Sequence, residues 1–108
     1  MKWDNKNSEE LFQAILELKT LDETKRFFRD LLTPEEIVEF AKRWQVARLL
    51  DAEVSYIEIN RQTKLSSTTI ARISKWLKNG MGGYKLIISR THQHHHSSLS
   101  SQRRGLVL

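Results

Sequence analysis

The sequence predicts an all-α fold, on the evidence of two patterns that recur along most of the chain. Apolar residues return at the spacing of helix turns, and a capping residue stands in front of each apolar series. A chain of 108 residues, 39% of them hydrophobic, can build one modest core and needs no second globular domain. We therefore expect one helical domain over residues 1–90 and a low-complexity tail over residues 91–108.

The first two helices are predicted from their N-terminal caps, because an exposed helix start needs side-chain acceptors for its unpaired N–H groups. Ser8 precedes two acids and an apolar series at helical spacing, which predicts a helix over about residues 8–19. Thr20 or Asp22 then begins a second short helix that ends near residue 31. The apolar face of the first helix is too wide for so small a core to cover, so we expect a second copy of the chain to cover the rest.

The third helix has the clearest start. Thr33 stands at the N-cap, Pro34 at the first helical position and Glu36 three residues after the cap, a combination typical of helix N-termini. The apolar face continues to about residue 51. Acids gather in the first turns, where the helix dipole favours negative charge, and we interpret them as capping groups rather than as a catalytic pair: Glu35, Glu36 and Glu39.

Two shorter helices follow in close succession. Ser55 and Glu58 have the spacing of a capping box and predict a helix over about residues 55–63. Ser66 and Thr69, with Leu65 and Ile70, repeat the cap and staple geometry. They predict a helix over about residues 67–78, after a turn of only three or four residues. A short helix, a tight turn and a second helix form a helix-turn-helix, here over residues 55–78. Tight helical hairpins also occur for purely structural reasons, so the pattern alone does not establish a function.

The composition changes after the fifth predicted helix. Gly80 indicates a helix stop, and the glycine-rich run over residues 79–83 indicates a linker, because it lacks the Lys-Ser/Thr pair of a phosphate-binding loop. Residues 84–88 have strand composition, which predicts either a short strand or an extended arm packed on a partner subunit. From Thr91 onward Gln, His, Ser and Arg dominate without a core pattern, so this tail is expected to be disordered.

Charge is distributed unevenly along the chain, whose formal net charge is +5. Residues 1–53 hold 12 acids and 9 bases, whereas residues 54–108 hold 9 bases and a single acid, Glu58. A solvated surface usually intersperses acids among its bases. This concentration of bases therefore favours binding to a polyanion such as nucleic acid.

Several other classes of protein are disfavoured by the sequence. The chain has no cysteine and no apolar stretch near the ~20 residues that span a bilayer, so we expect a cytoplasmic protein without thiolate chemistry. No Ser/His/Asp set with a plausible scaffold is evident, and we predict no enzymatic activity, no cofactor and no metal site. The histidines of the tail have no fixed geometry and are interpreted as part of a solvated segment: His92, His94, His95 and His96.

The last predicted helix has an apolar face and a polar face. A step of about 100° per residue places one set of side chains on the core face. This set is Ile70, Ile73, Leu77 and, beside them, Ser74. The outer face is small, polar and basic, which suits a helix in the major groove of DNA, where hydroxyls hydrogen-bond bases or phosphates and Arg forks onto guanine. Hydroxyl residues at the helix start also suit phosphate binding, although capping alone would require only one of them. The predicted DNA-binding residues here are Ser66, Ser67, Thr68, Thr69, Ala71, Arg72 and Lys75.

Several blocks of the sequence resemble the Trp repressor superfamily, in particular its YerC/YecD-like branch. These blocks are residues 32–36, Arg43, residues 49–50 and residues 55–77, within a resemblance that covers about residues 8–78. The resemblance implies an all-helical, intertwined homodimer whose two helix-turn-helix units face successive major grooves.

In that superfamily, small and hydrophilic residues at the start of the recognition helix meet operator bases largely through water. The resemblance places this role on Ser67, Thr68 and Ala71, with Asn60 near the DNA backbone. The last helix of the family is expected to be replaced here by the glycine-rich segment and residues 84–88, so that the end of the dimer differs.

The resemblance also implies an effector pocket. The Trp repressor holds tryptophan between two arginines, which correspond to Arg43 and Arg72, and Thr33 matches a threonine near that pocket. A glycine and a serine of the family's pocket are replaced by Ile73 and Trp76, which add bulk where the ligand lies. We therefore predict that L-tryptophan is not a strong corepressor of this protein.

The sequence leads to one main function and two alternatives. We expect a homodimeric transcriptional regulator that binds a palindromic double-stranded DNA site and has no membrane partner. The first alternative is a protein-interaction or assembly module that keeps the scaffold without operator binding. The second is a sequence-nonspecific nucleic-acid binder, which would show steep salt dependence without sequence preference.

Overall fold

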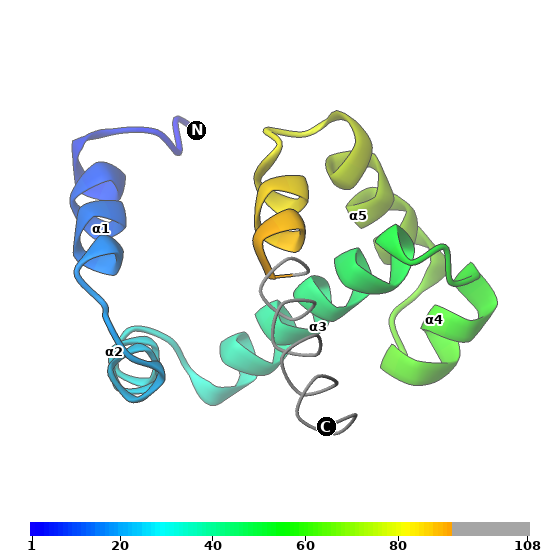
Figure 1. Cartoon of the computed structure of the whole chain (residues 1–108), viewed down its shortest axis with the longest axis horizontal. Helices are drawn as coiled ribbons and strands as arrows, with labels where there is room; N and C mark the ends of the chain where they lie inside the picture. The colour runs from blue at the N-terminus through cyan, green and yellow to red at the C-terminus, as the bar shows by residue number, and fades with distance from the viewer. Residues whose placement is uncertain (92–108) are drawn as a thin grey trace, which may run out of the picture. The chain divides into compact units, whose positions relative to one another are not determined.

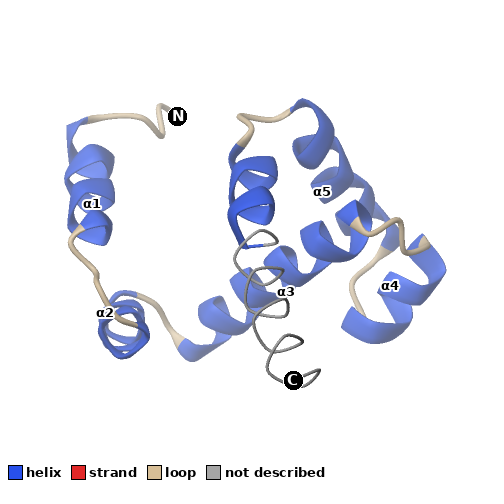
Figure 2. Ribbon diagram, in the orientation of Figure 1, coloured by secondary structure: helices blue, strands red, loops and turns tan. Residues whose placement is uncertain are grey.

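The structure, a computed structural model, describes residues 1–91, and the secondary structure of that part of the chain is helical throughout (Figures 1 and 2). The helices in chain order are α1 (Lys6–Leu16), α2 (Leu21–Leu31), α3 (Pro34–Asp51), α4 (Tyr56–Thr63) and α5 (Ser67–Asn79). Residues 83–91 form a further helical segment. The all-α prediction is confirmed. Thr91, the first residue of the predicted tail, is the last residue of the segment 83–91, so it is helical rather than disordered. The four histidines and the other residues of the predicted tail, 92–108, lie outside the described residues.

The chain divides into two compact units, one over residues 1–39 and one that begins at Phe40. The first unit contains α1, α2 and the first turns of α3. The second contains the rest of α3 together with α4, α5 and the segment 83–91.

Helix α1 begins earlier than predicted, because its cap is Asn5 rather than Ser8. The Asn5 Oδ1 accepts a hydrogen bond from the Ser8 N–H at 3.0 Å, and the Ser8 Oγ accepts one from the Asn5 N–H at 2.8 Å. Ser8 is thus the reciprocal partner of the cap. The helix ends at Leu16, before the predicted residue 19, and the Lys19 N–H donates instead to the Glu23 carboxylate of α2 at 2.9 Å.

The caps of α2 and α3 follow the predictions. The Thr20 Oγ1 accepts from the Glu23 N–H at 3.1 Å, so Thr20 rather than Asp22 is the N-cap of α2. At the start of α3, the Thr33 Oγ1 accepts from the Glu36 N–H at 3.2 Å, and the Glu36 carboxylate accepts from the Thr33 N–H at 3.0 Å. This reciprocal capping box confirms the predicted start of α3.

The first unit exposes much of its apolar surface. Neither α1 nor α2 contains a buried residue. Leu16 is 74% exposed and Leu21 is 71% exposed. Trp3 and Phe12 contact each other edge to face, with ring centroids 6.5 Å apart, yet both rings remain exposed. The amphipathic helices α1 and α2 therefore lack a core of their own.

The hydrophobic core lies in the second unit. It consists of buried side chains from α3, α4 and α5, namely Val46, Ala47, Ile59, Ile70 and Ile73. Leu77 and Ser74 are also buried, so the core face predicted for α5 is confirmed. Because this face is buried, the other face of α5 is turned toward solvent.

The prediction of a strand or extended arm over residues 84–88 is wrong, because this stretch lies inside the helical segment 83–91. Tyr84 and Ile88 are one helical turn apart and both pack against the core, and the Tyr84 ring stacks on Trp44 with ring centroids 6.2 Å apart. Strand propensity depends strongly on context, and here the packing of one helix face overrides it. The expected replacement of the family's last helix is wrong for the same reason.

Gly80 ends α5 at a position where no side chain fits. Its N–H donates to the Trp76 carbonyl oxygen at 2.9 Å, and a Cβ at position 80 would lie only 2.4 Å from that oxygen. We expect Gly80→Ala to lower the free energy of unfolding by about 1–3 kcal/mol, because the backbone must shift to relieve the clash. Urea unfolding followed by circular dichroism measures the loss.

The matched control is Gly83→Ala, because a Cβ at position 83 meets no atom within 4 Å. Alanine favours the helix that this residue begins, so the control should keep its stability or gain up to about 1 kcal/mol. Wild-type stability in the Gly80→Ala variant would contradict the geometry assigned to the end of α5.

Candidate nucleic-acid interface

Helices α4 and α5 pack against each other and are joined by a turn of residues 64–66 (Figure 1). Ser55 is the N-cap of α4 and Ser66 the N-cap of α5, each accepting a hydrogen bond from a backbone N–H in the first turn of its helix. Ile59 of α4 and Ile70 of α5 are both fully buried in the core. The predicted helix-turn-helix is therefore present, with its second helix held against the core of the unit.

The turn between these helices is held by side chains of α4. Lys64 adopts the left-handed conformation with φ 63°, and its N–H donates to the Asn60 carbonyl oxygen at 2.7 Å. The Asn60 Nδ2 donates to the Leu65 carbonyl oxygen at 2.6 Å. The Thr63 Oγ1 accepts from the Leu65 N–H at 3.2 Å and donates to the Ile59 carbonyl oxygen at 2.8 Å. The side-chain amide of Asn60, predicted to lie near DNA, is thus engaged within the protein.

The solvent face of α5 carries one row of polar side chains, which we call the outer stripe: Thr68, Arg72, Lys75 and Asn79. These residues follow one another at intervals of three or four and are all exposed, as is Ala71 beside them. The outward orientation expected for the polar face is confirmed. Contact of this face with DNA remains a prediction.

The hydroxyl residues at the start of α5 fall into two pairs. The Ser66 Oγ accepts from the Thr69 N–H at 3.2 Å and donates to the Thr69 Oγ1 at 3.1 Å, so this pair forms the cap. Ser67 and Thr68 are exposed, and within residues 1–91 their side chains make no hydrogen bond. Capping therefore accounts for one pair and leaves the other available to a ligand.

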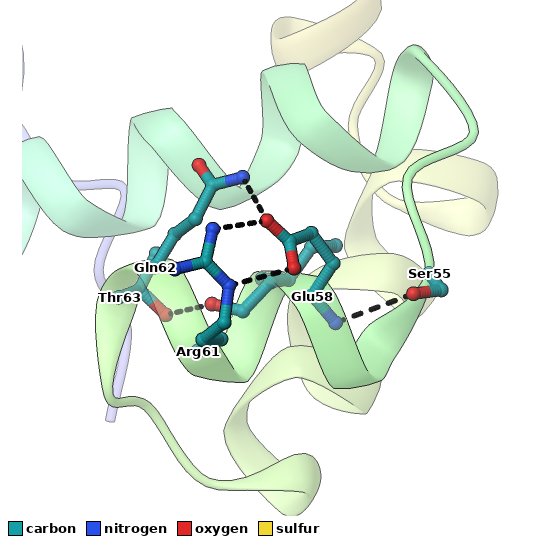
Figure 3. Close-up of polar contacts among 6 residues, drawn as sticks. Ser55, Glu58, Arg61, Gln62 and Thr63 are labelled. Carbon is teal, nitrogen blue, oxygen red and sulfur yellow. Dashed lines mark hydrogen bonds and ion pairs between the residues drawn. The ribbon is translucent and has the colours of Figure 1, made fainter.

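Glu58 is the only acid of residues 54–91, and its charge is neutralised within α4 (Figure 3). Its carboxylate accepts from the Arg61 Nε at 2.8 Å and from the Gln62 Nε2 at 3.1 Å. These two hydrogen bonds, that of Arg61 first, lower the pKa of Glu58 from 4.5 to about 2, and the same contact raises the pKa of Arg61. The predicted capping box is only half formed, because the Ser55 Oγ accepts from the Glu58 N–H while the carboxylate turns to Arg61.

The other cations of residues 54–91 form no ion pair with a described residue. They are Lys64, Arg72, Lys75, Lys78, Lys85 and Arg90. All six are exposed. Since the charges of Glu58 and Arg61 cancel, residues 54–91 present a net positive surface that includes the outer stripe.

The residues implied for an effector pocket divide between core and surface. Ile73 is only 1% exposed and belongs to the core, whereas Trp76 is 45% exposed and Arg72 lies in the outer stripe. Thr33 lies in the first unit as the cap of α3. The Arg43 guanidinium carbon lies 5.4 Å from the centroid of the Phe40 ring.

Two features of the second unit were missed by sequence reasoning. Thr63 is buried and holds the turn, and the Trp44 ring of α3 stacks on Tyr84 of the segment 83–91. Both depend on contacts between residues distant in sequence or across an irregular turn. Periodicity carries no signal for such contacts.

The described residues contain no group of His, Cys, Asp or Glu side chains that could hold a metal ion. In the same part of the chain, no helix has the length and apolar composition required to cross a membrane.

Comparison with known proteins places this geometry in a family. The Trp repressor protein family matches residues 6–92. The chain is 39% identical over 89 residues to the uncharacterised protein YerC of Bacillus subtilis (strain 168), a match that covers 82% of this chain and 86% of YerC.

Solved structures agree with the sequence comparison. The crystal structure of a TrpR-like protein from Eubacterium eligens is similar with a TM-score of 0.79 and 38% identity, over 83% of this chain and 93% of that one. A Staphylococcus aureus protein proposed to be a Trp repressor has a TM-score of 0.78 and 33% identity, over 85% of this chain and 95% of its own. The residues that the family matches, 6–92, include all five helices α1 to α5 and thus the helix-turn-helix. The chain belongs to the Trp repressor family.

Proposed function

We propose that this protein is a sequence-specific, DNA-binding transcriptional regulator that acts as a homodimer through the helix-turn-helix of α4 and α5. The observation that carries this proposal is the outer stripe. Its polar and basic side chains are exposed on the helix whose opposite face is fixed in the core. Membership of a family of regulators rather than enzymes supports the same conclusion.

The chemistry of the outer stripe fits the edges of bases in a major groove. Arg72 carries a planar guanidinium that can donate two hydrogen bonds to guanine, and Thr68 has a hydroxyl that both donates and accepts. Ala71 leaves room for close approach of the helix to the bases. Lys75 and the other unpaired cations supply attraction to phosphates, which adds affinity without sequence information.

The exposed apolar faces of the first unit support the homodimer. Helices α1 and α2 contain no buried residue, although both carry large apolar side chains. Exposed apolar surface of this extent is characteristic of protein interfaces, and a symmetric partner is the usual solution in small helical proteins. Two copies would also present two helix-turn-helix units to a palindromic site.

The two alternative functions differ from this proposal in measurable ways. An assembly module on the same scaffold would use the apolar faces of α1 and α2 but bind no DNA. A nonspecific binder would use the unpaired cations alone, and its affinity would fall equally with salt for every sequence. Selection of bound fragments from random double-stranded DNA separates the three cases, because only the proposed regulator enriches a common site.

We expect a stable dimer at micromolar concentration, because the apolar faces of α1 and α2 require a cover. Sedimentation equilibrium of the full chain measures the mass directly. Leu21→Glu, which places a charge on a side chain that is 71% exposed in the single chain, should shift the equilibrium toward monomer. Lys25→Ala on the same helix lowers the net charge by the same single unit at an exposed position and is the control for the change in charge. A stable wild-type monomer would overturn the homodimer.

We expect Arg72→Ala and Thr68→Ala to weaken binding to the selected DNA site without unfolding the protein, since both side chains are exposed. Loss of a base-contacting Arg should cost about 1–3 kcal/mol of binding free energy and relax the preference at one base pair. Fluorescence anisotropy with the selected site and with single-base variants measures both effects. Lys25→Ala on α2 is the control, because it also removes one positive charge. Wild-type affinity in both Arg72→Ala and Thr68→Ala would exclude α5 as the recognition helix.

We expect no saturable binding of L-tryptophan at millimolar concentration, because Ile73 fills its place in the core and Arg72 and Trp76 remain at the surface. Isothermal titration calorimetry tests binding, and DNA affinity measured with and without the amino acid tests coupling. A micromolar dissociation constant, or tighter DNA binding in the presence of tryptophan, would reverse this prediction.

A further inference from the structure

We infer that Asn60 and Thr63 are positioning residues, which set the pose of α5 through Leu65 and thereby control discrimination between DNA sequences. The inference rests on the proposed function, because it concerns how the recognition helix is presented. Its basis is one observation in the turn. The backbone N–H of Leu65 and its carbonyl oxygen are both held by side chains of α4, at 3.2 Å from the Thr63 Oγ1 and 2.6 Å from the Asn60 Nδ2.

Leu65 is the residue whose backbone directs α5. It immediately precedes the N-cap Ser66, and its own side chain packs against the core. Lys64 before it adopts a left-handed conformation, which is unfavourable for a residue with a side chain. The two hydrogen bonds to the N–H and the carbonyl oxygen of Leu65 therefore stabilise a turn that the left-handed conformation of Lys64 disfavours.

Neither positioning residue is placed to read bases itself. Thr63 is only 2% exposed, and its hydroxyl both donates to the Ile59 carbonyl oxygen and accepts from the Leu65 N–H. The donor group of Asn60 is directed to the turn at 2.6 Å. Valine at position 63 would keep the shape of the buried side chain and leave the Leu65 N–H without that partner.

The pose of α5 affects base contacts more than phosphate contacts. A bidentate bond to a base edge requires the donor atoms within a few tenths of an ångström, whereas attraction to phosphates acts over about 8 Å at physiological salt. A tilt of the helix after loss of the turn bonds would therefore reduce the affinity for the selected site and leave nonspecific affinity nearly unchanged. The number of phosphates neutralised, and hence the salt slope, should also stay the same.

The test measures the ratio of affinities for the selected site and for a scrambled duplex, across a range of salt concentrations. Asn60→Ala and Thr63→Val should each lower this ratio roughly 3- to 10-fold, the effect of one lost hydrogen bond. Thr63→Ser keeps the hydroxyl that Thr63→Val removes, so this variant should retain most of the wild-type ratio. Gln62→Ala is the matched control, because this amide on the same helix bonds Glu58 rather than the turn and should leave the ratio unchanged.

A second measurement reports on the turn without DNA. Amide hydrogen exchange at Leu65 should accelerate in Thr63→Val and return toward the wild-type rate in Thr63→Ser, because only the hydroxyl accepts from that N–H. All measurements are made well below the unfolding transition. If the buried variant fails to fold, the exposed Asn60→Ala still tests the inference.

The outcomes separate this inference from the proposed function. If the wild-type protein prefers no DNA sequence, the proposed function fails, whatever the exchange data show. If the wild type discriminates while Asn60→Ala and Thr63→Val keep the full ratio, the positioning inference is overturned. Equal losses of affinity on both duplexes in Asn60→Ala would identify Asn60 as a contact to the DNA backbone and would also overturn it.

Discussion

The arrangement of the second unit depends on the burial of one face of α5. Ile70 and Ile73 form one buried cluster with Val46 and Ala47 of α3 and Ile59 of α4. Each of these side chains is almost completely buried. Burying an aliphatic side chain contributes about 1.5–3 kcal/mol, so this small cluster provides much of the stability available to so short a segment. The exposure of the outer stripe follows from it, because the buried face of α5 determines which of its residues remain outside.

Much of this architecture could be predicted from sequence because it is local. Capping depends on residues three apart, so Thr33, Ser55 and Ser66 identify three helix starts without tertiary information. The helix over residues 83–91 could not be predicted in this way. Its β-branched residues favour a strand in isolation, and it is helical where Tyr84 and Ile88 reach Trp44 and the core, partners distant in sequence.

In the candidate site too, features that depend on regular helix geometry could be predicted, and features that depend on irregular contacts could not. The outer stripe could be predicted because a regular helix turns by a constant angle, which determines the side of Thr68 and Arg72 once the apolar face is known. The role of Asn60 could not, because its amide reaches across an irregular turn whose path depends on the left-handed Lys64. The choice of Glu58 between its own cap and Arg61 is likewise decided by side-chain geometry.

The lack of buried residues in α1 and α2 has a consequence for the thermodynamics of the whole protein. Short helices are marginal in water without a packed face, so their order is coupled by mass action to whatever covers them. If a second copy of the chain covers α1 and α2, the concentration of the DNA-binding dimer rises with the square of the monomer concentration at low abundance. The concentration of the protein in the cell would then control the occupancy of its DNA site, with a threshold concentration and without any small molecule.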